Sequence, residues 1–134
     1  MVLLLEPSSS PQGVRASAKN STSVSVSWAA VGNEQRNGII KGYKVIYQAL
    51  PDGRNVTRFV NISDEDQGKE QDMTLGDLVK FTNYSIRVLA FTVVGDGPPS
   101  EVKIVQTQQD SKLHSSCKIL KIILMFSVKN ILTL

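Results

Sequence analysis

Four large side chains constrain this chain more than any other feature: Trp28, Tyr43, Leu78 and Tyr84, followed by a Gly-x-Gly-Pro-Pro-Ser turn over residues 95–100. Large side chains at these separations fill the space between two packed β-sheets, where the inner faces of both sheets meet. They define the kind of fold far more closely than they define a function. The sequence therefore predicts a two-sheet core built around these four residues.

Short stretches that alternate between apolar and polar residues surround these positions, and each ends at turn-forming residues. This pattern is typical of antiparallel strands with one buried face. The alternation is clearest over residues 23–28, 42–47 and 83–92, where the predicted inward side chains are Val24, Val26, Trp28, Tyr43, Val45, Tyr47, Tyr84, Ile86, Val88 and Ala90. In the last of these stretches, the predicted outward side chains are Ser85, Arg87, Leu89 and Phe91.

Weaker patterns predict four further strands: one from about Val14, one over 56–62, one near 73–75, and a last one carrying Val102, Ile104 and Gln106. No stretch has the period of a helix. Seven strands over roughly a hundred residues predict an all-β fold, a seven-stranded antiparallel two-sheet sandwich of the immunoglobulin-like class.

The 134 residues fit one domain with two ends: a disordered head over 1–10, the sandwich over 11–108, and a linker with an apolar tail over 109–134. The net charge of +3 comes from the tail, because residues 11–110 hold eleven basic and eleven acidic side chains. We therefore predict no nucleic-acid binding. The head shows no targeting signal, so an extracellular chain would need a leader further upstream.

The tail from Lys118 to Leu134 is apolar but interrupted by Lys121 and Lys129. It is short for a membrane span and its charges are costly there, and the spacer of a lipid-anchor signal is nearly missing. An alternative or truncated chain end is the preferred interpretation, followed by a helix lying on a membrane surface.

No pattern of residues predicts catalysis. His114 and Cys117 both lie in the tail, no Gly-rich phosphate loop precedes a helix, and no nucleophile has a base at a suitable spacing. The acidic stretch 64–72 does not have the spacing of a calcium loop and is expected to be a solvated loop. We expect no enzyme activity, no cofactor and no metal.

A family resemblance rests on an ordered set of short motifs: Val14-x-Ala16, Ser25-Val26-Ser27-Trp28, Gly42-Tyr43-x-Val45-x-Tyr47, Leu78 six residues before Tyr84, Arg87-Val88-x-Ala90, and Gly95-x-Gly97-Pro98-x-Ser100. Together they resemble a fibronectin type III domain over residues 11–108. The resemblance implies that Trp28 lies between the sheets and that Leu78 and Tyr84 form a corner whose hydroxyl bonds to backbone. The family's Arg-Gly-Asp motif is missing, since the loop reads Val-Gly-Asp-Gly over 94–97.

Four of the seven asparagines begin an Asn-x-Ser/Thr sequon, and they are the candidate N-glycosylation sites: Asn20, Asn55, Asn61 and Asn83. Ordinary Ser and Thr usage would give about one such match by chance. The excess favours an extracellular or cell-surface location.

A candidate partner surface lies on the expected outer face of one sheet and comprises Lys44, Arg58, Arg87, Leu89 and Phe91. Its cations could form a stripe for weak glycosaminoglycan contact, and its apolar members could meet a protein partner or an adjacent domain. The sequence thus predicts a non-catalytic extracellular spacer and protein-contact module of a cell adhesion molecule or receptor. The alternative is an intracellular scaffold-type module with unused sequons.

Overall fold

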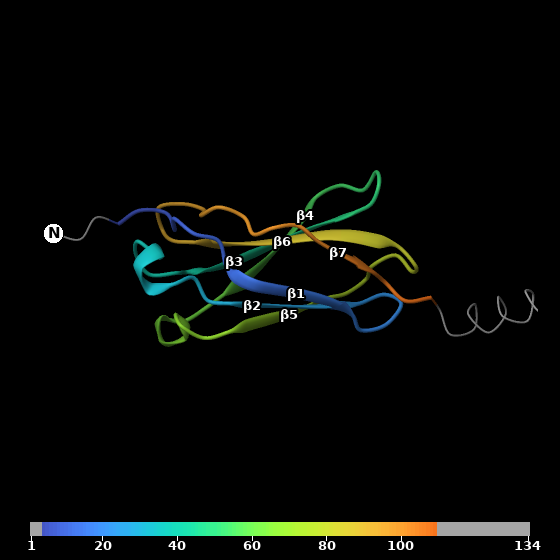
Figure 1. The fold of residues 1–134 in the computed structure, drawn as a ribbon, viewed down its shortest axis with the longest axis horizontal. Coiled ribbons are helices and arrows are strands. Elements are labelled where there is room, and N and C mark those ends of the chain that lie inside the picture. The colour runs from blue at the N-terminus through green and yellow to red at the C-terminus, as the bar shows by residue number, and fades with distance from the viewer. Residues whose placement is uncertain (1–3, 110–134) are drawn as a thin grey trace, which may run out of the picture.

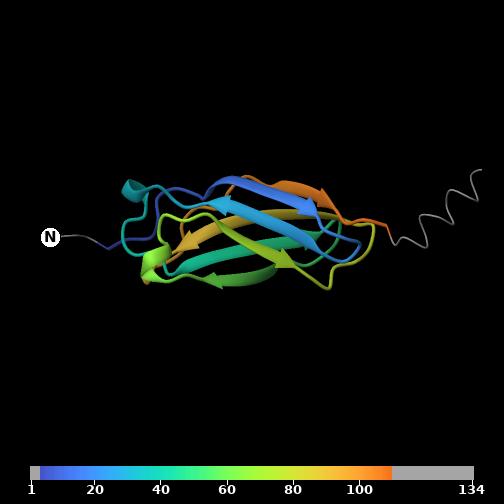
Figure 2. The same cartoon turned by 90° about the horizontal axis from the view of Figure 1, so that it is seen from below.

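The computed structural model describes residues 4–109, which form seven β-strands in two facing sheets (Figures 1 and 2). The strands are β1 (Gln12–Ala18), β2 (Val24–Ala29), β3 (Gly42–Ala49), β4 (Val56–Asn61), β5 (Gln71–Leu75), β6 (Asn83–Phe91) and β7 (Lys103–Gln106). The predicted all-β, two-sheet antiparallel sandwich is confirmed. Two short 3₁₀ helices, η1 (Asn33–Gln35) and η2 (Asp64–Asp66), were not expected from the sequence.

One sheet has three strands in the order β1-β2-β5, and the other has four in the order β4-β3-β6-β7. All pairs are antiparallel. The ends of the described chain lie at opposite ends of the long axis, and both 3₁₀ helices lie at the end where the chain enters (Figures 1 and 2). The loops at the two ends of the sandwich are therefore separate surfaces.

The core forms between the sheets because alternate residues of each central strand point inward. Val24, Val26 and Trp28 on β2 are fully buried, as are Tyr43 and Val45 on β3. The indole ring of Trp28 meets the ring of Tyr43 edge-on, with 5.5 Å between the ring centroids. The predicted inward faces of β2, β3 and β6 are thus the faces that the structure buries.

A corner before β6 fixes how the chain enters that strand. The backbone N–H of Val79 donates a hydrogen bond of 2.8 Å to the hydroxyl oxygen of Tyr84, and the N–H of Leu78 donates one of 2.9 Å to the Thr22 carbonyl. Both Leu78 and Tyr84 are buried. A tyrosine in this place satisfies a backbone donor while its ring fills the core.

The last strand, β7, contains Ile104 and Gln106 as expected, and Val102 lies just before it. Val102 and Ile104 are 54% and 58% exposed, whereas Val105 packs against the core and Thr107 is buried. The Thr107 hydroxyl donates to the Val79 carbonyl at 2.7 Å and accepts from the Thr82 N–H at 2.9 Å. The inward side chains of this segment are therefore those of Val105 and Thr107.

Residues 4–10 also differ from the predicted disordered head. The Leu5 N–H donates to the Asn37 carbonyl and the Ser8 N–H donates to the Gln35 carbonyl, both at 2.9 Å. Pro7 is fully buried. This part of the head lies along the loops at the entry end of the sandwich, so the ordered structure begins before residue 11. The tail over 110–134 lies outside the described residues.

Candidate glycosylation and contact surface

The outer face of the four-stranded sheet is defined by strand register, because residues directly opposite one another on antiparallel strands share a face. Phe59 of β4 lies opposite Lys44 of β3, and Lys44 lies opposite Leu89 of β6. The next row along the sheet is Asn61, Gly42 and Phe91. These two rows place a sequon asparagine beside aromatic side chains.

Lys44, Phe59, Phe91 and Asp96 form one cluster at this end of the face, which we call the Phe59 patch. The two phenyl rings meet edge-on with 6.2 Å between their centroids. The ammonium of Lys44 lies 5.4 Å from the Phe59 centroid and 5.6 Å from that of Phe91, and its Nζ is 2.9 Å from a carboxylate oxygen of Asp96. The cation is therefore held by both ring faces and by a carboxylate.

The predicted cationic stripe is not formed. Arg58 lies opposite Val45, whose side chain is in the core, so Arg58 is on the other side of the sheet from Lys44. It stays exposed because β4 is an edge strand. Since the charge of Lys44 is paired with Asp96, Arg87 is the remaining cation of the three on the outer face, opposite Ile46. The structure thus removes the basis for the glycosaminoglycan contact.

The two apolar residues of the predicted partner surface, Leu89 and Phe91, also differ from the prediction in how much they are exposed. Leu89 is on the outer side of β6 but only 7% exposed, so it offers little contact area. Phe91 is half-buried by its contacts within the patch. Besides Ile104 of β7, at 58% exposed, this face presents the aromatic side chain of Phe59, at 60% exposed. Sequence analysis missed it, although its position two residues before Asn61 on the same strand was a usable signal.

All four sequon asparagines are exposed, in different local settings. Asn20 lies in the turn between β1 and β2, where its Oδ1 accepts the Thr22 N–H at 2.9 Å. Asn55 precedes β4, Asn61 is its last residue, and Asn83 is the first residue of β6. An accessible asparagine in a loop or at a strand end is the setting that N-glycosylation needs.

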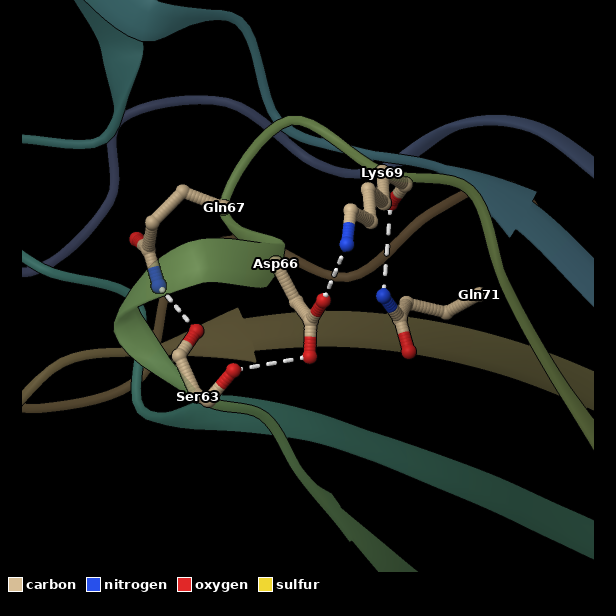
Figure 3. Close-up of polar contacts among 5 residues, drawn as sticks. All are labelled: Ser63, Asp66, Gln67, Lys69 and Gln71. Atoms are coloured by element: carbon tan, nitrogen blue, oxygen red, sulfur yellow. Dashed lines mark hydrogen bonds and ion pairs between the residues drawn. The ribbon is translucent and has the colours of Figure 1, made fainter.

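The acidic stretch is a hydrogen-bonded loop that contains η2 and leads into β5 (Figure 3). Lys69 Nζ is 2.9 Å from one oxygen of Asp66, and the Ser63 hydroxyl donates to the other at 2.8 Å. These two contacts, that of Lys69 first, lower the pKa of Asp66. The side-chain amide of Gln67 both donates to and accepts from the Ile40 backbone at 2.7 Å, which ties the loop to the entry end.

The described residues contain no group of three or more His, Cys, Asp and Glu side chains that could hold a metal ion. Within residues 4–109, no helix is long and apolar enough to cross a membrane. His114, Cys117 and the apolar tail lie outside the described range.

The sequence profile of the fibronectin type III domain matches residues 9–106. The chain belongs to the fibronectin type III family. Its domain is 43% identical over 105 residues to the human cell adhesion molecule DSCAM, and 41% identical over 103 residues to human receptor-type tyrosine-protein phosphatase F. These matches cover 78% and 77% of this chain but 5% of the length of each relative.

Solved structures agree with this assignment. The FN1–FN3 domains of chicken CNTN1 superimpose with a TM-score of 0.66 at 28% identity, over 78% of this chain and 33% of that one. The fibronectin type III domain described above is thus of a kind found repeatedly in adhesion molecules and receptors, and modules of this kind are non-catalytic parts of longer chains.

Proposed function

We propose that this fibronectin type III domain is an extracellular spacer and protein-contact module of a cell-surface adhesion molecule or receptor. Its work is geometric: it sets the distance between its neighbours in a longer chain and presents its end loops to them. No step of this function requires bond making or breaking.

The observation that carries the proposal is the placement of the two ends of the described chain at opposite ends of the sandwich (Figures 1 and 2). A domain with this arrangement adds its full length to a chain of modules, whereas a domain with adjacent ends would add a side branch. The similarity to adhesion molecules and a receptor phosphatase, of which the chain spans only 5%, fits a repeated module of this type.

Contact with a neighbouring domain would be made through the entry end. Exposed apolar side chains gather there because the head runs beside the loops: Gly38 approaches Leu4, and the Thr92 hydroxyl donates to the Leu5 carbonyl at 2.9 Å. The apolar set comprises Leu4, Leu5, Ile39, Val93 and Val94, which are 44% to 70% exposed. Clusters of exposed apolar residues of this kind are typical of contact surfaces.

Glycosylation tests the extracellular part of the proposal. The full chain would be expressed in mammalian cells behind an added secretory leader, and its mass compared before and after enzymatic removal of N-glycans. We expect a loss of mass that corresponds to at least one glycan, and mapping by peptide mass spectrometry would show which sequons carry it. A secreted chain with every sequon unmodified would contradict the proposal and favour the intracellular scaffold-type module.

A further inference from the structure

Two aromatic side chains are exposed within residues 4–109, and each lies two positions before a sequon asparagine. Phe59, at 60% exposed, precedes Asn61, and Phe81, at 56% exposed, precedes Asn83. The other described aromatic rings are buried or half-buried. The Phe59 ring adjoins the half-buried Phe91 ring, so it belongs to an apolar patch of the kind that a partner or ligand covers. The recurring position of an asparagine suggests which one.

Strand geometry places Phe59 and Asn61 on the same face of β4. Residues two apart on a strand point to the same side and lie about 7 Å apart along it. Val60, between them, packs against the core, so both neighbours point outward. The situation at Phe81 is different, because this residue has a positive φ of 47° and lies before β6 rather than within a strand. Phe59 therefore has the better-defined relation to its asparagine.

In the row across the sheet, the Phe91 ring lies over Gly42, between its own strand and Asn61. Gly42 lies opposite Asn61, and Phe91 lies opposite Gly42 on the far side. A Cβ atom at Gly42 would meet the Val60 carbonyl oxygen at 2.4 Å and the Phe91 ring at 2.9 Å. With glycine there, nothing but backbone separates Asn61 from the edge of the Phe91 ring.

The chemistry of the patch suits a sugar. The faces of aromatic rings are electron-rich, and Lys44 already uses this property by lying within 5.6 Å of both ring centroids. The C–H groups on one face of a pyranose ring carry partial positive charge and pack against such a surface. Asn61 is also unengaged, because its side-chain amide makes no hydrogen bond in the described part of the chain, whereas that of Asn20 does.

We propose that Asn61 carries an N-linked glycan whose first sugar packs against Phe59 and meets the edge of the Phe91 ring that lies over Gly42. The sugar covers the exposed aromatic surface of the Phe59 patch and leaves the apolar end loops free for a neighbouring domain. This inference rests on the proposed extracellular function, because the glycan is added only in the secretory pathway. The Phe59 patch would then contact a sugar attached to the same chain instead of a protein partner.

A variant with one sequon isolates the effect. Replacing Asn20, Asn55 and Asn83 by Gln leaves Asn61 as the only sequon, and the same chain is prepared with its glycan trimmed to one N-acetylglucosamine and without any glycan. Thermal unfolding of the two forms is compared with Phe59 intact and in the Phe59→Ala variant. We expect the sugar to raise the Tm by roughly 4 °C or more when Phe59 is present, and by about 1 °C or less when it is absent.

A matched control uses the other exposed ring. In the same background, Phe81→Ala should leave the stabilisation by the Asn61 sugar unchanged, because Phe81 belongs to a different part of the surface. If Phe59→Ala does not fold, Phe59→Leu retains most of the bulk without the ring. Upfield ring-current shifts of the sugar protons, seen by NMR and lost in the leucine variant, then provide a readout that does not depend on stability.

The outcomes separate this inference from the proposed function. Glycans at other sequons of the full chain with Asn61 empty would overturn the inference and leave the extracellular function intact. An Asn61 sugar that stabilises the Phe59 and Phe59→Ala forms equally would do the same. Absence of glycan from every sequon would overturn both proposals, and a sugar effect that depends on Phe59 would support both.

Discussion

At the scale of single residues, the Trp28–Tyr43 pair shows how far a sequence pattern reaches. The alternation around each residue was enough to predict that both rings point into the core, and both are fully buried. The pattern could not predict whether the polar atoms of these two side chains would find hydrogen-bond partners. The Trp28 Nε1–H and the Tyr43 hydroxyl are both buried without a hydrogen-bond partner in the described structure.

The Tyr43 hydroxyl leads to a prediction on pH dependence. Burial raises the pKa of Tyr43 above its ordinary value of 10.0, and this effect exceeds the opposite effects of the Val31 backbone and Arg36. The unfolded chain therefore loses this proton at a lower pH than the folded chain. The ionisation of Tyr43 leaves the free energy of unfolding unchanged well below pH 10. As the pH rises above about 10, it lowers this free energy by up to about 1.4 kcal/mol per pH unit.

Urea unfolding between pH 8 and 11.5 measures this effect. The wild-type chain should lose stability more steeply above pH 10 than the Tyr43→Phe variant, which has no proton to release at this position. Other groups titrate in the same range in both proteins, so the difference between the two curves is the quantity that matters. Parallel curves would show that Tyr43 ionises equally in the folded and unfolded chains.

At the scale of elements, central strands were predictable and edge strands were less so. On β2, β3 and β6 the facing sheet buries one side, so polarity alternates with burial. On the edge strands β4 and β7 the same alternation carries less information. Arg58 is on the core side of β4 yet exposed, and Ile104 is on the outer side of β7 despite being apolar. Register there must be read from the pairing.

The alternation on β6 can be tested with two adjacent substitutions. Ile86 is fully buried, so Ile86→Ala should lower the free energy of unfolding by about 2 to 5 kcal/mol by leaving a cavity. Arg87 points outward beside Ile46, so Arg87→Ala should change it by no more than about 0.5 kcal/mol. Chemical denaturation of both variants gives the comparison. Similar losses at the two positions would mean that the faces of β6 are not distinct.

At the scale of the whole molecule, the sandwich could be predicted but its starting point could not. The head over 4–10 is short and rich in Ser and Pro, and it has no periodic pattern that sequence analysis could use. Its order depends on loops that come from distant parts of the chain: Asn37 and Gln35 accept from its backbone, and the Thr92 hydroxyl donates to Leu5. The Phe59 patch has a similar non-local origin. Its side chains come from β3, β4, β6 and a loop, which lie together only in the folded chain, so the sequence alone did not predict the patch.

A truncation tests whether the head belongs to the domain. Removing residues 1–10 deletes the Leu5 and Ser8 backbone hydrogen bonds and exposes the surface that Pro7 covers. With about 1 kcal/mol for each hydrogen bond and a further contribution from the lost burial, the free energy of unfolding should fall by roughly 2 to 3 kcal/mol. Removing only residues 1–3 is the matched control, because it retains the contacts of residues 4–10.

The two truncations would be compared by urea unfolding and by hydrogen exchange. Exchange should become faster in the loops that hold the head, around Gln35 to Asn37 and around Thr92, while the central strands keep their protection apart from the global loss. If the chain that starts at Pro11 unfolds at the same urea concentration as the full chain, the head contributes nothing to the fold, and the apolar entry end would have to be redefined without Leu4 and Leu5. A loss of the expected size would instead show that the domain includes Leu4 and Leu5, which belong to the surface proposed for contact with a neighbouring domain.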